Sequence, residues 1–234
     1  MFMNQAPRSI FYLIGLFVSP FLLMMPALGD DKSKDEETLR NASTVLSAML
    51  ESGNVPTDLL AKANCVVVLP GVKKVGFGVG GSGGRGPMSC RGGKDFSGTW
   101  SAPAMYTVGA ASVGLQVGAS SSDFVLLVMT QNGVDALLKN KTELGTNASA
   151  AAGPSGATSS DTGTDIFTYG RAKGLFAGAT LGAASLEVDN DANKRLYDKA
   201  LTTKDIVMEN AVQATPGGQS LVSLLNSKIP KHGN

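Results

Sequence analysis

The sequence predicts an α+β fold in which helices at both ends of the chain flank a glycine-rich, mainly antiparallel sheet that can curl into a barrel. Three observations predict it. Apolar residues recur at helical spacing near both ends, short β-branched runs alternate with turn residues between them, and most of the 29 glycines lie in the same central region. The length, 234 residues, is normal for one domain with an ordinary core.

The first predicted elements are two helices. Residues 35–51 place Leu39, Leu46 and Met49 on one face, and Gly53 with Asn54 then stops the helix. A second, short helix follows Pro56. The polar face of the first helix begins acidic rather than basic, so we expect it to pack on the domain instead of lying on a membrane.

The central stretch, residues 65–123, organises the rest of the chain. Residues 66–69 predict a buried strand that ends in a turn at Pro70 and Gly71. Residues 75–80 alternate apolar side chains with glycine, and so leave one face of a strand as bare backbone. Either another layer of the same protein or an apolar ligand must press against that face, because interior strand glycine is otherwise destabilising.

The second half of the chain predicts further strands and then helices. Residues 123–129 are continuously apolar, which indicates a buried strand. A short helix, a segment of small residues at 144–156, a polar loop at 157–165 and strands between 166 and 188 should follow. Residues 190–200 predict a helix, and Thr202 with Asp205 resembles a capping box. Pro216 and the two glycines after it should break the chain before a last amphipathic helix.

The N-terminus has the pattern of a cleaved signal peptide. Arg8 precedes an apolar stretch at 10–25, and residues 27–29 form a small-x-small cleavage site. This stretch is short for a membrane span. We therefore expect export to the periplasm or cell envelope, with residues 1–29 as signal peptide, 30–212 as a single domain, and 213–234 as a C-terminal extension.

Export would place Cys65 and Cys90 in an oxidising compartment. The two cysteines bracket the first glycine-rich segment. The sequence leaves open whether they form a disulfide or remain two buried thiols.

Charge and composition exclude nucleic acid as a partner. Lys and Arg total 20 against 19 Asp and Glu, and only 6% of residues are aromatic. The chain therefore lacks both the clustered cations that bind phosphates and a platform for stacking bases.

Three catalytic or ligand-binding patterns occur but lack their required context. The run Gly78-x-Gly80-x-x-Gly83 has no helix after it to receive a pyrophosphate. Ser82 lies in a hydrolase-like Gly-x-Ser-x-Gly pattern, but the single histidine is His232, in the tail. The Asp189 segment starts like a calcium loop without its glycine and glutamate. We predict no catalytic residues, metal or cofactor.

The cations around the glycine-rich segment suggest a site for an anionic headgroup. Such a site would use Lys73, Lys74, Arg85, Arg171 and Lys173. The alternative is that these are solvated charges at loop ends.

Several motifs in order resemble the SYLF domain family. The residues that carry the resemblance are Val66-Val67-Val68-Leu69-Pro70 with Lys73-Lys74 and Gly76-Phe77, Gly84-Arg85-Gly86, Trp100-Ser101-Ala102-Pro103, residues 114–119 with Asp123, residues 148–154, and Tyr169-x-Arg171-x-Lys173 followed by Gly174-Leu175-Phe176-Ala177-Gly178. The resemblance runs from about Leu39 to Tyr197. One departure is Ser82-Gly83, where the family often has a Lys-Tyr pair.

The resemblance implies binding rather than catalysis. Eukaryotic members bind phosphoinositide membranes, and some bind or bundle actin. We therefore predict a lipid- or membrane-binding domain in which the five cations contact anionic headgroups and Phe77, Trp100 and Phe176 offer apolar contact. The alternative is a structural or protein-interaction domain of the envelope with no lipid ligand. For an exported bacterial protein, actin would not be the partner.

Overall fold

The computed structural model describes residues 1, 28–154, 163–172, 174–181 and 183–229. Residues 2–27 of the predicted signal peptide and most of the predicted polar loop at 157–165 lie outside the described residues; Leu28 and Gly29, the last two residues of the predicted signal peptide, begin the first helix. The elements in order are α1 (Leu28–Ser52), α2 (Thr57–Lys62), β1 (Cys65–Cys90), the 3-10 turn η1 (Lys94–Phe96), β2 (Ala104–Val128), α3 (Gln131–Leu137), β3 (Lys141–Glu143), β4 (Ala150–Ala152), β5 (Ile166–Ala172), β6 (Leu175–Gly178), β7 (Ser185–Val188), α4 (Asn190–Tyr197), α5 (Thr203–Val207) and α6 (Pro216–Lys228).

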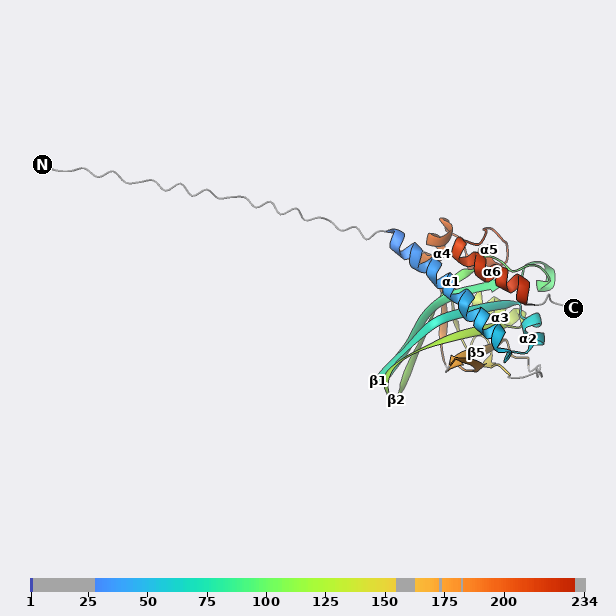
Figure 1. Cartoon of the computed structure of the whole chain (residues 1–234), viewed down its shortest axis with the longest axis horizontal. Helices are drawn as coiled ribbons and strands as arrows, with labels where there is room; N and C mark the ends of the chain where they lie inside the picture. Colours follow the sequence, from blue (N-terminus) through green and yellow to red (C-terminus); the bar gives the residue numbers. More distant parts are fainter. Residues whose placement is uncertain (2–27, 155–162, 173, 182, 230–234) are drawn as a thin grey trace.

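The predicted fold class is confirmed. Seven strands form one strongly curled, mostly antiparallel sheet, with β4 paired in parallel to β5, and helices lie at both ends of the chain (Figure 1). Helix α1 (blue) runs beside α6 (red). The predicted capping box is present at the start of α5, where the Thr202 and Asp205 side chains bond to each other's backbone.

Strand β1 does not end at Pro70. It continues to Cys90, and the predicted turn is a bulge where the register with β2 shifts between Leu69 and Val72. Proline is tolerated there because a bulge does not need its missing N–H. Gly71 takes a φ of 60°, a left-handed value that favours glycine, and its N–H donates to the Asp123 carboxylate at 2.9 Å.

Strands β1 and β2 both reverse near their midpoints. In a straight strand, Val72 and Gly84 would lie about 40 Å apart. Instead, a Cβ placed on Gly84 would lie 2.9 Å from Val72 Cγ2, and one placed on Gly86 would overlap the Val68 carbonyl oxygen. The hairpin is therefore doubled over into two plies: 65–77 pairs with 117–128, and 79–88 pairs with 104–113.

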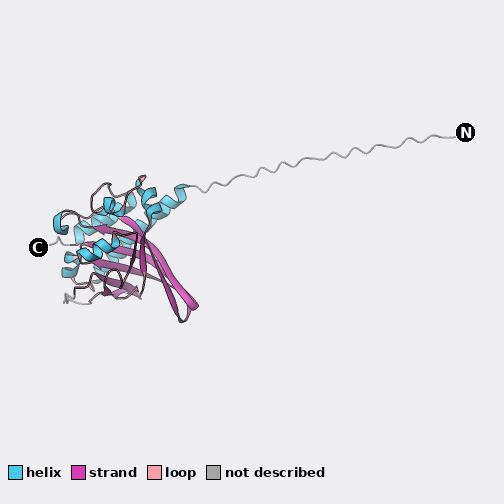
Figure 2. Ribbon diagram, turned by 180° about the vertical axis from the view of Figure 1, so that it is seen from behind, coloured by secondary structure: helices cyan, strands magenta, loops and turns pink. Residues whose placement is uncertain are grey.

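The doubled hairpin projects from the body of the domain. Figure 1 shows the midpoints of β1 and β2, where the labels stand, at the end of the projection, and Figure 2 shows the strands tapering away from the helices. For Gly84 and Gly86, the close neighbour is thus another layer of the same protein, whereas for the glycine face of residues 75–80 the two alternatives remain predictions. A larger side chain at Gly84 or Gly86 would push the plies apart.

The core has two parts, which lie on opposite faces of the ply that contains residues 65–77. Cys65, Val67 and Leu69 point between the plies, toward Met88 and Tyr106. Their neighbours along β1 point the other way, under α1 and α6, and this second cluster includes Val66, Val68, Leu46, Met49, Leu221 and Leu225. Because successive side chains of β1 point to opposite faces, this one strand contributes to both parts of the core.

Helix α6 begins at Pro216, although Pro216-Gly217-Gly218 was expected to break the chain. Proline suits the first turn of a helix, where its missing N–H has no partner to lose. The Glu36 carboxylate on α1 accepts from the Gly217 N–H at 2.5 Å and the Thr215 hydroxyl at 3.2 Å. Thr215 also caps the helix through the Gly218 N–H. These bonds and the apolar face of α6 attach the segment 213–229 to α1.

Candidate functional site

Arg85 lies in an internal charge network. Its guanidinium donates to the Asp35 carboxylate at 2.6 Å and to Asp189 at 3.0 and 2.8 Å. Arg195 donates to the other Asp35 oxygen at 2.7 Å. The Asp35 side chain is fully buried, so its charge depends on these two arginines.

Within this network, the positive charges of the arginines and the negative charges of the carboxylates stabilise one another. Burial acts to lower the pKa of the Arg85 guanidinium, but hydrogen bonding and charge from Asp35 and Asp189 outweigh it and raise that pKa above its ordinary value. The hydrogen bond to Asp35 also raises the pKa of Arg195. Two cations, Arg85 on β1 and Arg195 on α4, face two carboxylates, Asp35 on α1 and Asp189, the residue that caps α4. Arg85 is therefore a structural cation that joins these elements, instead of the free headgroup contact expected from the sequence.

Arg171 is also engaged by a carboxylate. Its guanidinium lies 3.6 Å from Asp123, the same residue that accepts the Gly71 N–H, and 5.9 Å from the centre of the Phe176 ring. Lys173, predicted to act beside it, lies outside the described residues.

The predicted apolar contacts are not at the surface. Trp100 is 4% exposed, lies 4.5 Å below the Arg91 guanidinium, and belongs to the cluster under α1 and α6. Phe176 is 1% exposed in the same cluster. Neither ring presents a surface to a lipid in this structure, because both serve the core. The side chain of Phe77 lies outside the described residues.

Lys73 and Lys74 are exposed on the projecting hairpin and point to opposite faces of the ply. Lys73 lines a groove between α1 and the hairpin, with a volume of about 660 Å³, and Lys74 lines a cavity between the plies. No ion pair holds either lysine among the residues that the structure describes. The next residue, Val75, is 57% exposed.

These residues define the hairpin tip, which is residues 73–75 with their paired partners 119–121. The pairs are Lys73 with Ser121, Lys74 with Ser120 and Val75 with Ala119, and every member is exposed. The hairpin tip therefore exposes two cations, one apolar side chain and their small neighbours to solvent. The five cations thus separate into three groups: free lysines at the tip, arginines paired with carboxylates, and one residue that is not described.

Cys65 and Cys90 form a disulfide, with both residues fully buried. The bond joins the first and last residues of β1, which the reversal of the strand has brought together. It therefore closes the base of the doubled hairpin.

Sequence reasoning missed the acidic partners of Arg85. Asp35 and Asp189 lie 50 and 104 residues away along the chain. Asp35 is the first residue of the predicted 35–51 helix, and nothing in its local pattern distinguishes a buried carboxylate from a solvated one. Val75 stood in the alternating run, but its exposure depends on the reversal of β1.

The described residues contain neither a metal-binding cluster nor a membrane-spanning helix. In that part of the chain, no cluster of three or more histidine, cysteine or acidic side chains has the arrangement of a metal site. Within the same ranges, no helix combines the length and apolar character needed to cross a membrane.

The fold is an α+β domain from which a doubled hairpin projects, with Lys73, Lys74 and Val75 exposed on it. The family model described as Ysc84, a Las17-binding protein actin regulator, matches residues 109–228. The chain belongs to this family, whose shared domain is the SYLF domain, so the resemblance drawn from the motifs is confirmed.

Relatives from fungi and mammals support this family assignment. The chain is 33% identical over 183 residues to an SH3 domain-containing protein of Schizosaccharomyces pombe, covering 75% of this chain and 41% of the relative. It is 30% identical over 212 residues to LAS seventeen-binding protein 3 of Saccharomyces cerevisiae, covering 84% and 45%. For the SH3 domain-containing YSC84-like protein 1 of Mus musculus the identity is 29%, covering 88% and 61%.

The chain therefore spans less than half the length of the two fungal relatives. No solved structure matches it.

Proposed function

We propose that this chain is a non-catalytic interaction domain that binds a protein partner through the hairpin tip. The observation that carries the proposal is the separation of roles along β1. Arg85, nearer the base, is paired with Asp35 and Asp189, whereas Lys73 and Lys74 are exposed beside Val75 and have no ion pair among the described residues. The family description, which names a Las17-binding actin regulator, supports a protein partner for this chain as well.

The tip favours an acidic partner surface with an apolar patch. Two free lysines attract acidic groups over a distance of about 10 Å at ordinary salt. Val75 then supplies apolar area that is lost from water on contact. Both features lie on strands joined to the body by continuous hydrogen-bond pairing, which limits the entropy lost on binding.

The test is co-sedimentation of residues 30–234 with actin filaments. We expect sedimentation that salt weakens and that the triple variant Lys73→Gln, Lys74→Gln, Val75→Ser reduces by about tenfold or more. The matched control is Lys139→Gln with Lys199→Gln, which removes two exposed lysines from the body. Equal loss in both variants would show that net charge, not the tip, drives the interaction.

A second candidate function is binding to anionic membranes through the same tip. Paired lysines next to an exposed valine also suit a surface of anionic headgroups, where each basic residue contributes about 1 kcal/mol. Neutral and anionic vesicles, at low and high salt, separate the two candidates. Sedimentation with anionic vesicles but not with filaments would assign the tip to lipid.

We further propose that the chain is exported to the cell envelope. The signal-peptide pattern at 8–29 and the buried disulfide between Cys65 and Cys90 both support an oxidising destination. In that compartment the partner would be an envelope protein, and the actin-filament assays then test only whether the tip has the actin-directed surface that the family description names. Fractionation of cells that produce the full chain tests this: intact precursor retained with the cytosol would contradict it.

A further inference from the structure

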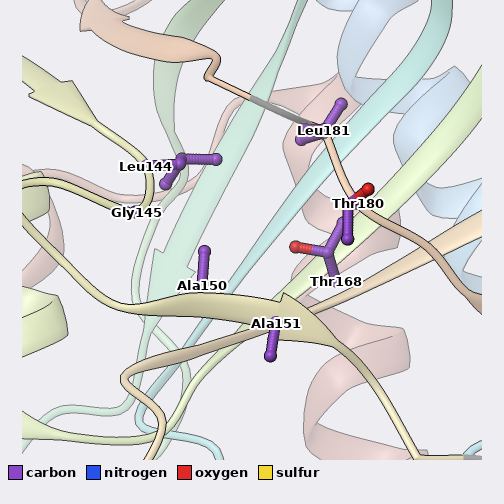
Figure 3. Close-up of a pocket in the computed structure, with 7 residues that line it drawn as sticks. All are labelled: Leu144, Gly145, Ala150, Ala151, Thr168, Thr180 and Leu181. Carbon is purple, nitrogen blue, oxygen red and sulfur yellow. The ribbon is translucent and has the colours of Figure 1, made fainter.

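Two neighbouring cavities lie along the inner side of the doubled hairpin. One, of about 300 Å³, lies between the plies and is lined by Val72, Lys74, Ser82, Ser120, Ser122 and Phe124, among others. The second, of about 200 Å³, is lined by residues that include Leu144, Ala150, Thr168 and Leu181; in Figure 3 the Ala150 side chain points into the space between them, whereas that of Ala151 points away. Thr180 and Leu181 line both, so the cavities share a wall.

The two cavities differ in chemistry. The smaller one is lined mainly by apolar side chains, with Thr168 and Thr180 as its hydroxyl groups. The larger one has an ammonium group, Lys74, and the hydroxyls of Ser82, Ser120 and Ser122. The pairings of Lys74 with Ser120 and Val72 with Ser122 explain this, because directly paired residues share a face of a strand pair.

We propose that the two cavities together bind a single-chain anionic amphiphile: a carboxylate with a medium-length alkyl chain. Lys74 and the serine hydroxyls hold the carboxylate, and the chain extends past Leu181 toward Leu144 and Ala150. A cation that has no ion pair among the described residues, at one end of an apolar cavity, is complementary to such a ligand. This site shares Lys74 with the hairpin tip, but it goes beyond the proposed function because its ligand is a small amphiphile held in the cavities and not a protein partner.

The volumes favour one alkyl chain over two. Each cavity lies at or below the low end of the range of about 300–1,000 Å³ typical of small-molecule sites. The alkyl chain could come from a free fatty acid or from a membrane phospholipid. These share their chemistry, and the experiment separates them.

Calorimetric titration of residues 30–234 with dodecanoate, below its micelle concentration, tests the site. We expect saturable binding to one site. Lys74→Gln should weaken it roughly tenfold to a hundredfold, the effect of losing one charge-assisted hydrogen bond. Lys199→Gln, an exposed lysine that lines neither cavity, should leave the affinity unchanged. Undiminished binding by Lys74→Gln would overturn the carboxylate site.

Two further arms test the tail and the source of the chain. Ala150→Phe fills the smaller cavity and should weaken dodecanoate about tenfold while octanoate is affected less; thermal unfolding checks that the variant folds. Dodecyltrimethylammonium, with the same chain and the opposite charge, should not bind. No dodecanoate binding, or equal binding of both amphiphiles, would refute the proposal. Binding only to vesicles of phosphatidylglycerol, and its loss in Ala150→Phe, would assign the cavities to a phospholipid chain and refute a site for the free acid.

Discussion

The base and the tip of the doubled hairpin belong to the same two strands but solve different physical problems. At the base, the Arg85 guanidinium is paired with Asp35 and Asp189, and Cys65 is bonded to Cys90. At the tip, Lys73, Lys74 and Val75 are exposed. A cation next to a glycine-rich segment is therefore not by itself a binding residue, because a carboxylate of the same protein can already be paired with it.

The largest expected effect is at the contact between the plies. Gly86→Ala would place a methyl group against the Val68 carbonyl oxygen, and backbone atoms on both plies would have to move. We expect a loss of at least about 4 kcal/mol in the free energy of unfolding, measured by urea denaturation. Gly83→Ala is the matched control, since its methyl would lie 3.7 Å from the nearest atom. Equal losses in the two variants would contradict the two-ply arrangement.

The disulfide comes next. The double variant Cys65→Ala, Cys90→Ala opens a loop with a sequence separation of 25, and should lower the free energy of unfolding by about 3 kcal/mol. Reduction of the wild-type protein should give a similar loss in urea denaturation, and the double variant should then be insensitive to reductant. A reductant effect that persists in the double variant would contradict the assignment.

Breaking the charge network at the base should cost somewhat less. Asp35→Asn leaves Arg85 and Arg195 without their shared carboxylate, but both arginines are partly exposed, so water compensates in part. We expect a loss of about 2 kcal/mol in the free energy of unfolding. Lys32→Gln, which removes an exposed ion pair with Asp198, should change it by less than about 0.5 kcal/mol.

A smaller effect appears at low pH. Burial acts to raise the pKa of Asp165, but hydrogen bonds from Thr130, Ser149 and Asn132 outweigh it and leave the pKa below its ordinary value. The stabilisation is therefore present above the ordinary pKa of about 4 and lost as the pH falls through the lowered value. Asp165→Asn should be less stable than wild type near neutral pH, by about 1 kcal/mol, and the difference should shrink in acid. A difference in unfolding temperature that stays constant from neutral to acid pH would exclude this role.

The smallest effect on stability should be at the tip. Lys73→Gln with Lys74→Gln removes two solvated charges without an ion pair in the described structure, so the free energy of unfolding should change by less than about 0.5 kcal/mol. Thermal and urea unfolding measure it. A loss comparable to that of Asp35→Asn would mean that the tip is a structural element like the base.

Local patterns predicted much of the fold. The complete burial of residues 65–69, the apolar run at 125–128 and the capping box at Thr202 follow from apolar patterning and short-range hydrogen bonding, so the sequence alone was sufficient. The continuation of β1 past Pro70 was not predicted, because Pro70 looks like a stop unless a bulge absorbs it, and the reversal of the strand further on was not predicted either. The helix start at Pro216 was missed for a similar reason: a local breaker was read without its packed neighbours.

The candidate site could be predicted only in its composition. The sequence identified Lys73, Lys74 and Arg85 by their proximity to glycine, but not that Asp35, 50 residues before Arg85, neutralises one of them. The side chains of Trp100 and Phe176 resembled binding residues for the same reason that they are core residues: both are large and apolar. Long-range pairing decides such cases, and it depends on the folded topology.

Whether the hairpin tip binds the partner is tested most directly by hydrogen–deuterium exchange of residues 30–234 with and without actin filaments. We expect filaments to slow exchange in peptides covering 72–76 and 118–122, and to leave exchange in α1 and α6 unchanged. Slowing concentrated in α1 and α6, with the tip unaffected, would contradict the assignment of recognition to the hairpin. No slowing at all would remove actin as the partner.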